Sequence, residues 1–335
     1  MAAQFIPPPL ESLKNKVVVL TGGVLGIGSE IVRICHSQGA HVFFGDVLAE
    51  KGLAFERELA KSSVEGQNTC FVQTDAADYQ SNLNLFETAH RACGRVDHAV
   101  SAAGVSERGN ITDPSLTLES VKEEPRQAMS VLNIDLVGLI YFSRIASVYL
   151  RQGDNTDIES QTRPNTISDT SGVPPSPWLA PKPTTKSLTL VSSIAGFTEA
   201  PGLAVYSTAK HGVIGLMRSL RKTLMDGPGS GIRTNAICPW MTKTRLVSGV
   251  EEAWAKAQLP SNEPADVAMI IAGVMADKML NGASLYVEGG RAWDVEPGID
   301  GTMPTWMGEE RCAEWRRGQI VLGSGADWQN REAGS

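Results

Sequence analysis

The chain has 335 residues, of which 42% are hydrophobic and 20% are charged, a composition typical of a globular protein that buries one large core. Its formal net charge is −7. We expect no nucleic-acid partner, because a protein that follows a phosphate backbone needs a basic surface. The five cysteines are widely scattered, which predicts reduced thiols and no metal site.

The start of the chain and its longest apolar stretch both argue against a membrane. The first residues, MAAQFIPPPLESLKNK, lack a basic segment followed by an apolar one, so no secretory signal is predicted. The apolar stretch near 131–150 contains Asp135 and Arg144, which indicates a buried helix rather than a membrane span. We therefore expect a cytoplasmic protein with no membrane partner.

The first half of the chain alternates between strand and helix patterns. Residues 17–20 form an apolar, β-branched run, which predicts a strand buried on both faces of a sheet. A glycine-rich turn and a helix over 29–38 follow. Strands over 40–44, 70–73 and 98–101 then alternate with helices. This order predicts an α/β fold with a Rossmann-type, doubly wound parallel sheet flanked by helices.

The second half resumes the alternation after a long helix over 131–150. We expect strand, helix, strand, helix and strand over 187–191, 206–225, 233–237, 264–278 and 283–287. No internal repeat interrupts this order, which predicts that both halves belong to one sheet.

Two segments depart from the alternation. Residues of about 152–186 are rich in Asp, Asn, Ser, Thr and Pro, which predicts a polar surface insert. It joins a helix to the start of a strand, so we expect it to lie away from the chemistry. The tail over about 292–335 is expected to be irregular. We predict a single domain over 1–335, with its core at about 14–291.

The segment TGGVLGIG at 21–28 lies between the first strand and the first helix. Glycines let the backbone turn tightly and approach a diphosphate, and the N–H groups at the helix start attract that anion. In this context the pattern favours a dinucleotide-binding loop over the alternative of a plain glycine-rich turn. We expect cofactor contacts at Gly22, Gly26, Ile27 and Gly28.

Asp46 ends the second predicted strand. A carboxylate there accepts hydrogen bonds from the adenosine ribose hydroxyls and repels a 2′-phosphate. No Arg or Lys lies in 23–25 or directly beside Asp46, so NAD is favoured over NADP. The alternative is a surface aspartate that caps the next helix.

Tyr206 and Lys210 are four residues apart on a predicted helix, so they share a face. A free phenol is a poor base at neutral pH, but a neighbouring ammonium favours the phenolate. Ser193 follows a buried strand, where it can orient a substrate oxygen toward Tyr206. An isolated pair of this kind is more often solvated. The order of loop, strand, serine and pair favours an acid–base site in which Tyr206 and Lys210 also contact the cofactor.

Together these motifs resemble the short-chain dehydrogenase/reductase family over about 14–291. The matching pieces are TGGVLGIG, Asp46, Asp75–Ala76, SAAG at 101–104, Asn133, SSIAG at 192–196, YSTAK at 206–210 and CPWMTKT at 238–244. These motifs follow one another along the chain from the glycine-rich loop to the segment after the last catalytic residue. They include residues expected to bind the cofactor and residues expected to bind the substrate.

The resemblance implies further roles. Asp75 and the backbone of Ala76 would contact the adenine, and the backbone of Ala102 and Gly104 would line the cofactor ribose. Thr242 and Thr244 would hold the nicotinamide carboxamide. Asn133 would interrupt its helix and hold a water that relays protons to Lys210; the alternative is an ordinary polar residue within a helix.

Three segments depart from the family pattern. SAAG at 101–104 stands where Asn-Asn-Ala-Gly is usual, and Val-Glu-Gly-Gly at 287–290 replaces Val-Asp-Gly-Gly. Pro239–Trp240 replaces Pro-Gly, so an indole either shapes the substrate pocket or packs against its own loop. None of these changes removes a catalytic group.

The closing stretch LNGASLYVEGGRAWDVEPG resembles a branch common among filamentous fungi, many of whose members tailor terpenoids or polyketides. The loop 240–260 is the expected substrate lid, whose apolar residues either line a pocket or pack on the body as an amphipathic helix. The segment 105–115 is a second expected wall. The helices over 131–150 and 206–225 are apolar on more than one face, and with the resemblance this predicts a homodimer or homotetramer.

The sequence therefore predicts NAD-dependent oxidation of a secondary alcohol to a ketone, or the reverse, on a bulky apolar small molecule. Asp46 favours oxidation, because cytosolic NAD is usually the oxidising pool. Two alternatives remain open: a non-redox epimerase or cyclase on the same scaffold, and a catalytically silent nucleotide-binding protein.

Overall fold

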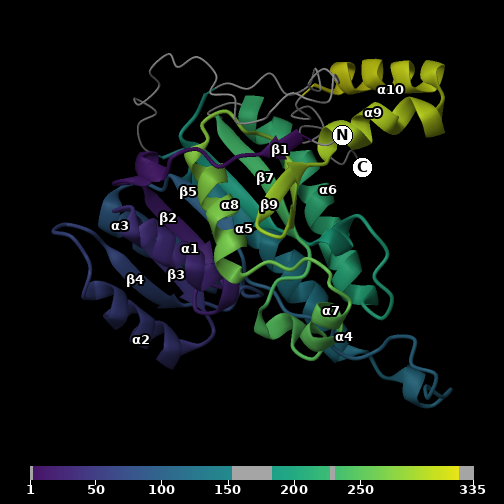
Figure 1. Cartoon of the computed structure of the whole chain (residues 1–335), viewed down its shortest axis with the longest axis horizontal. Coiled ribbons are helices and arrows are strands. Elements are labelled where there is room, and N and C mark those ends of the chain that lie inside the picture. The colour runs from purple at the N-terminus through teal and green to yellow at the C-terminus, as the bar shows by residue number, and fades with distance from the viewer. Residues whose placement is uncertain (1–2, 153–182, 227–230, 324–335) are drawn as a thin grey trace, which may run out of the picture.

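The computed structural model describes residues 3–152, 183–226 and 231–323, so most of the expected polar insert lies outside the described residues. One sheet has the order β1-β9-β8-β7-β6-β5-β2-β3-β4 (Figure 1). Its strands are β1 (Ala3–Phe5), β2 (Val17–Thr21), β3 (His41–Asp46), β4 (Thr69–Gln73), β5 (His98–Ser101), β6 (Lys186–Val191), β7 (Ile232–Pro239), β8 (Ser284–Glu288) and β9 (Arg291–Asp294).

The helices follow the strands in the expected alternation. They are α1 (Gly26–Ser37), α2 (Ala49–Ala60), α3 (Tyr79–Cys93), α4 (Arg126–Leu132), α5 (Gly138–Tyr149), α6 (Ala204–Asp226), α7 (Glu251–Lys256), α8 (Pro264–Ala276), α9 (Glu296–Met307) and α10 (Glu309–Leu322). Strands β2 to β8 pair in parallel, which confirms the predicted Rossmann-type sheet. The antiparallel edge formed by β1 and β9 was not predicted.

Helices cover both faces of the sheet. One core joins α1 and α8 to side chains such as Val18, Leu20 and Val100, and both helices lie on the viewer's side of the sheet in Figure 1. The opposite core joins α3, α5 and α6 to Val17, Val19 and neighbouring strands. Because β2 is buried along its whole length, its apolar run serves both layers.

The long helix predicted over 131–150 has three parts: α4, a π-helical segment (Asn133–Val137) and α5. By length and mean hydropathy, the run Arg126–Tyr149 is apolar enough to cross a membrane. In this fold, α5 instead contributes Leu139, Phe142 and Ile145 to the core against α3 and α6. The α5 part of this run therefore packs in the core, as the sequence predicts.

The expectation of an irregular tail is wrong for the part of it that the structure describes. Residues 291–294 pair as β9, and α9 and α10 follow, extending from the body in Figure 1. The carboxylate of Glu296 at the start of α9 accepts hydrogen bonds from Arg218 and Arg221 on α6, and from the hydroxyl of Ser284. A buried charge network therefore ties the tail to the sheet.

Candidate active site

The glycine-rich loop lies where the strand order reverses, between β2 and β5. Gly22 has a positive φ of 72°, and a Cβ there would lie 2.6 Å from the backbone nitrogen of Ala103. A Cβ on Gly28 would collide with the carbonyl oxygen of Gly22. The loop is therefore a cradle that only glycine can form, at the crevice where open α/β sheets bind ligands.

Asp46 lies beside this loop at the carboxyl end of β3. Its Oδ2 accepts a hydrogen bond from the backbone nitrogen of Val24 at 3.2 Å, and its Oδ1 accepts one from Leu48 at 3.1 Å. The carboxylate is thus held against the cradle, while also capping the turn before α2. The structure therefore shows the capping role of Asp46, and its contact with the adenosine ribose stays a prediction.

The remaining predicted cofactor positions follow neighbouring strand ends. Asp75 is exposed after β4 and accepts a hydrogen bond from Ala77, and Ala76 is buried beside it. Ala102 donates its backbone N–H to Thr21 at 3.2 Å. Gly104 is exposed three residues after β5 ends. These positions share the carboxyl edge of the sheet with the glycine loop.

Ser193 follows β6 in an extended conformation, with φ −164°. Its Oγ accepts a hydrogen bond from Ala195 at 3.2 Å, and the residue is 9% exposed. Its neighbour Ser192 donates a hydrogen bond to the carbonyl of Lys210 at 2.9 Å. This bond fixes the strand end against the helix that carries the catalytic pair.

Tyr206 and Lys210 lie on α6, as the spacing predicts. Tyr206 packs with Ala195, next to the Ser193 turn, and with Ala128 and Val131 of α4. The Nζ atom of Lys210 lies 5.3 Å from the centroid of the Tyr206 ring. Both side chains are almost fully buried, so the ammonium acts on the phenol in a medium of low dielectric constant.

The group that faces Lys210 from the π-helical segment between α4 and α5 is Asp135. Its Oδ2 lies 3.1 Å from Nζ of Lys210, and neither side chain is more than 5% exposed. Burial by itself lowers the pKa of Lys210, but the charges of Asp135 and Tyr206 outweigh that effect and raise the pKa above its usual value. Lys210 is therefore an ammonium at neutral pH.

The assignment of Asn133 as the proton-relay residue is wrong for this structure. Asn133 is exposed, whereas Asp135 is fully buried and reaches the lysine. The helix is interrupted as expected, since Asn133 starts the π-helical segment, but the inward-facing residue is two positions later. The available signal was a single carboxylate within an apolar stretch, which needs a charged partner when buried.

Thr242 and Thr244 lie on the loop after β7. A Cβ on Gly26 would lie 3.2 Å from Cγ2 of Thr244, so this threonine contacts the glycine loop. Thr242 is held by Asn262, a fully buried residue whose Nδ2 donates to Thr242 Oγ1 at 3.3 Å and to the Val287 carbonyl at 3.1 Å. Asn262, which belongs to none of the sequence motifs, ties the loop to the end of β8.

Trp240 packs within its own loop and lid. Its ring meets that of Trp254 on α7 edge to face, with centroids 4.9 Å apart, and Trp254 donates a hydrogen bond to the carbonyl of Pro260. Leu246, Val250 and Leu259 of the lid remain more than a third exposed. The predicted lid therefore has an indole pair as its anchor and an apolar exposed side.

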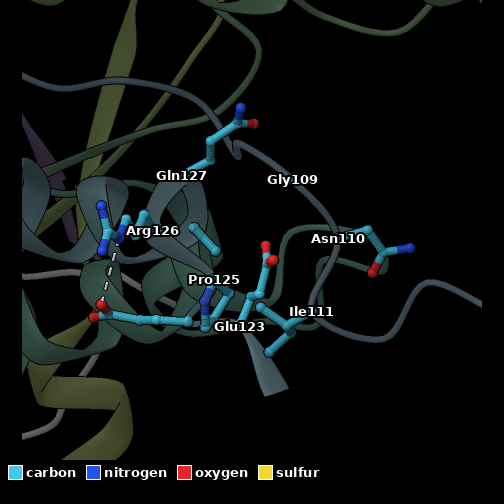
Figure 2. A pocket seen from close by; sticks show the side chains of 9 residues that line it. Gly109, Asn110, Ile111, Glu123, Pro125, Arg126 and Gln127 are labelled. Atoms are coloured by element: carbon cyan, nitrogen blue, oxygen red, sulfur yellow. Dashed lines mark ion pairs between the residues drawn. The ribbon is translucent and has the colours of Figure 1, made fainter. Parts of the chain in front are cut away.

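A groove of about 550 Å³ lies on the β5–α4 connection and the start of α4, on the wall expected over 105–115. Figure 2 shows Glu123, Arg126 and Gln127 around it, with an ion pair between Arg126 and Glu124 of 3.8 Å. Its lining combines charged and polar side chains with apolar ones such as Ile111 and Pro125, and it contains none of the three catalytic side chains. The groove therefore does not include the catalytic site.

The site and the fold together define a class of protein, and comparison with known proteins agrees. Residues 16–159 match the family described as short chain dehydrogenase, and residues 176–292 match the family described as enoyl-(acyl carrier protein) reductase. The chain belongs to the short-chain dehydrogenase/reductase family. It is accordingly an oxidoreductase scaffold of a family that binds a nicotinamide cofactor.

Relatives include dehydrogenases from fungi and from a bacterium. The chain is 29% identical over 290 residues to the short-chain dehydrogenase/reductase ascJ of Acremonium egyptiacum, covering 87% of this chain and 84% of that one. It is 27% identical to 5'-hydroxyaverantin dehydrogenase of Dothistroma septosporum, covering 90% and 92%. It is also 27% identical to a 3-alpha-(or 20-beta)-hydroxysteroid dehydrogenase of Mycobacterium tuberculosis, covering 83% and 90%.

Solved structures confirm the fold. A dehydrogenase/reductase from Sinorhizobium meliloti superposes with a TM-score of 0.63 at 22% identity, covering 84% of this chain and 97% of that one. A short chain dehydrogenase from Burkholderia cenocepacia in complex with NADP has a TM-score of 0.62 at 23% identity, covering 83% and 98%.

Proposed function

We propose that this protein is an NAD(H)-dependent alcohol dehydrogenase that interconverts a secondary alcohol and a ketone on a bulky, apolar small molecule. The observation that carries the proposal is the buried Tyr206–Lys210 pair, 5.3 Å from ring centroid to Nζ, on a helix fixed to the Ser193 strand end by the Ser192 bond. A nicotinamide, when bound, supplies the hydride acceptor or donor.

The chain's own residues supply binding and proton transfer. Ser193 orients the substrate oxygen, and Tyr206 takes its proton during oxidation or returns it during reduction. Lys210 supports the phenolate electrostatically. Thr242 and Thr244 close the loop over the cofactor side, and Gly22, Gly26 and Gly28 leave space for the diphosphate.

The choice of NAD rests on Asp46, whose carboxylate is fixed beside the glycine loop by the amides of Val24 and Leu48. A 2′-phosphate at that position meets a negative charge and no neighbouring cation in 23–25. The relative solved with NADP makes this choice the first point to test.

The substrate class rests on the lid and on the relatives. Exposed Leu246, Val250 and Leu259 present an apolar side, which suits a hydrophobic ligand. The relatives act on a hydroxyaverantin and on a hydroxysteroid, by their names. We propose a polyketide or terpenoid alcohol from secondary metabolism as substrate. We further propose that the protein is cytoplasmic and that it forms a homodimer or homotetramer. Sedimentation of the purified protein tests the oligomeric state.

The decisive experiment measures nicotinamide absorbance with NAD and NADP against a panel of polyketide and terpenoid secondary alcohols. Tyr206→Phe is expected to lose more than about a hundredfold in kcat while retaining NAD binding, since general acid–base catalysis contributes that much. Tyr79→Phe is the matched control, because Tyr79 is an exposed residue whose hydroxyl accepts a hydrogen bond from Arg144 on the surface. Turnover of an alcohol without a change in absorbance would instead favour a non-redox enzyme.

A further inference from the structure

The buried ion pair between Asp135 and Lys210 places a formal negative charge inside the catalytic site. The Oδ2–Nζ distance is 3.1 Å. The other oxygen, Oδ1, accepts a hydrogen bond of 2.8 Å from the backbone nitrogen of Val105, just after β5. Asp135 is completely buried, and these two contacts hold its carboxylate in one orientation.

The surroundings fit the pair closely. A Cβ on Gly104 would lie 3.3 Å from Oδ2 of Asp135 and 3.5 Å from Nζ of Lys210. Two residues after Lys210, a Cβ on Gly212 of α6 would lie 2.6 Å from a methyl carbon of Leu136, so the π-helical segment lies directly on α6. Gly104 therefore lets the β5–α4 connection approach the pair, and Gly212 lets the π-helical segment approach α6.

Two groups fix the Nζ atom of Lys210. Oδ2 of Asp135 forms an ion pair with it at 3.1 Å, and the carbonyl of Val191 at the end of β6 accepts a hydrogen bond from it at 3.4 Å. Asp135 thereby determines where the ammonium lies relative to the phenol.

The charges around Tyr206 come from four elements. Lys210 shares α6 with it, Asp135 comes from the π-helical segment, Glu107 comes from the β5–α4 connection, and Cys238 on β7 faces Lys210. Cys238 stays a neutral thiol, because burial raises its pKa well above the usual value. The field at the phenol is therefore set by the ammonium, which favours the phenolate, and by the carboxylates, which oppose it.

We propose that Asp135 is a positioning residue that fixes Lys210 and, by offsetting its charge, sets the pH at which Tyr206 exchanges its proton. The proposal deepens the proposed function and rests on Tyr206 as the proton-transferring group. Asp135 also supports the charge of Lys210, which burial opposes. In the pH range where Lys210 stays an ammonium, a neutral residue at 135 leaves that ammonium to act on the phenol unopposed. The phenolate then forms at lower pH, so alcohol oxidation extends to lower pH and ketone reduction ends at lower pH.

The test compares the wild type with Asp135→Asn, which keeps the shape and an oxygen acceptor but removes the charge. Tyrosinate absorbance is titrated in each protein and in its Tyr206→Phe counterpart, and the difference isolates Tyr206 among five tyrosines. This measurement needs neither substrate nor cofactor, so it can fail independently of the proposed function. The pH profile of kcat/KM for alcohol oxidation is recorded in parallel. Glu65→Gln, on an exposed turn, is the charge-matched control.

We expect the Tyr206 titration midpoint and the acid limb of oxidation to fall by about half a pH unit or more in Asp135→Asn, with Glu65→Gln unchanged. A midpoint in Asp135→Asn that equals or exceeds that of the wild type overturns the proposal, even where kcat falls. A merely structural role lowers kcat without moving the titration, and a higher midpoint would mean that Asp135 acts by keeping Lys210 charged and not by offsetting its charge. If Asp135→Asn does not fold, Asp135→Ser removes the same charge, leaves space for a water and is judged by the same two midpoints.

Discussion

The carboxylate of Glu107 caps the helix that carries Tyr206, from a position 99 residues earlier in the chain. Its Oε2 accepts the backbone N–H of Tyr206 at 2.7 Å, and its Oε1 accepts that of Val205 at 3.2 Å. Negative charge at a helix N-terminus is stabilising, and here it also binds the β5–α4 connection to α6. A predicted wall of the substrate site and the catalytic helix are therefore mechanically linked.

Glu107→Ala is expected to reduce the free energy of unfolding by roughly 1 kcal/mol, the usual cost of losing a helix cap. It is also expected to lower kcat several-fold, because the first turn of α6 positions Tyr206. Thermal unfolding and steady-state kinetics measure the two effects. Glu119→Ala serves as control, since its exposed ion pair with Lys122 contributes little. Identical behaviour of the two variants would contradict the link.

Asp46→Asn is expected to reduce the preference for NAD over NADP at least about tenfold in kcat/KM, since the charge that opposes a 2′-phosphate is gone. The amide keeps an oxygen that can accept from Leu48 or Val24, so the loop is preserved. The ratio of the two kcat/KM values is the measurement, with Glu65→Gln as control. An unchanged ratio would show that Asp46 only caps the turn before α2.

Local patterns were sufficient for the sheet and for the catalytic pair. The β2 run, the glycine loop and the spacing of Tyr206 and Lys210 each depend on neighbours a few residues away, so they can be recognised in the sequence. The β1–β9 edge depends instead on pairing Ala3–Phe5 with 292–294. Nothing within either short segment encodes such a distant partner.

The missed helices and the missed aspartate have different reasons. The α9 sequence contains Gly298 and Pro304 inside the helix, which disfavour a helix. Its position is secured by the bonds of Glu296 to α6, which only the fold brings together. Asp135 lies four residues after buried Val131 and four before buried Leu139, so helical spacing already places it on the buried face. The assignment of Asn133 came from the family resemblance and not from this spacing.

Asn133→Ala is expected to leave kcat/KM for alcohol oxidation within about twofold of the wild type, as is usual for an exposed position away from special features. This outcome follows from the exposed side chain of Asn133. Steady-state kinetics over a range of pH provide the measurement, because a proton relay through Asn133 would change the profile as well as the rate. A tenfold loss of kcat would show that Asn133 takes part in catalysis despite its exposed side chain.

Asp294 is a buried carboxyl that makes stability depend on pH. Burial, reinforced by the charge of Glu296, raises its pKa to about 7, although amides of Ser284 and Glu296 donate to it. The native protein therefore keeps a proton that the unfolded chain releases above its ordinary carboxyl pKa. Because the folded state binds more protons between about pH 4 and pH 7, the free energy of unfolding falls as pH rises through that window.

Asp294→Asn removes this ionisation while keeping an oxygen that accepts from the amides of Ser284 and Glu296. Between pH 5 and pH 8, the wild type is expected to lose on the order of 2 kcal/mol of unfolding free energy relative to the variant. Urea unfolding at the two pH values measures the difference, and Glu252→Gln on the exposed side of α7 is the control. Parallel pH dependence in the wild type and Asp294→Asn would mean that Asp294 is ionised in the native protein throughout this range.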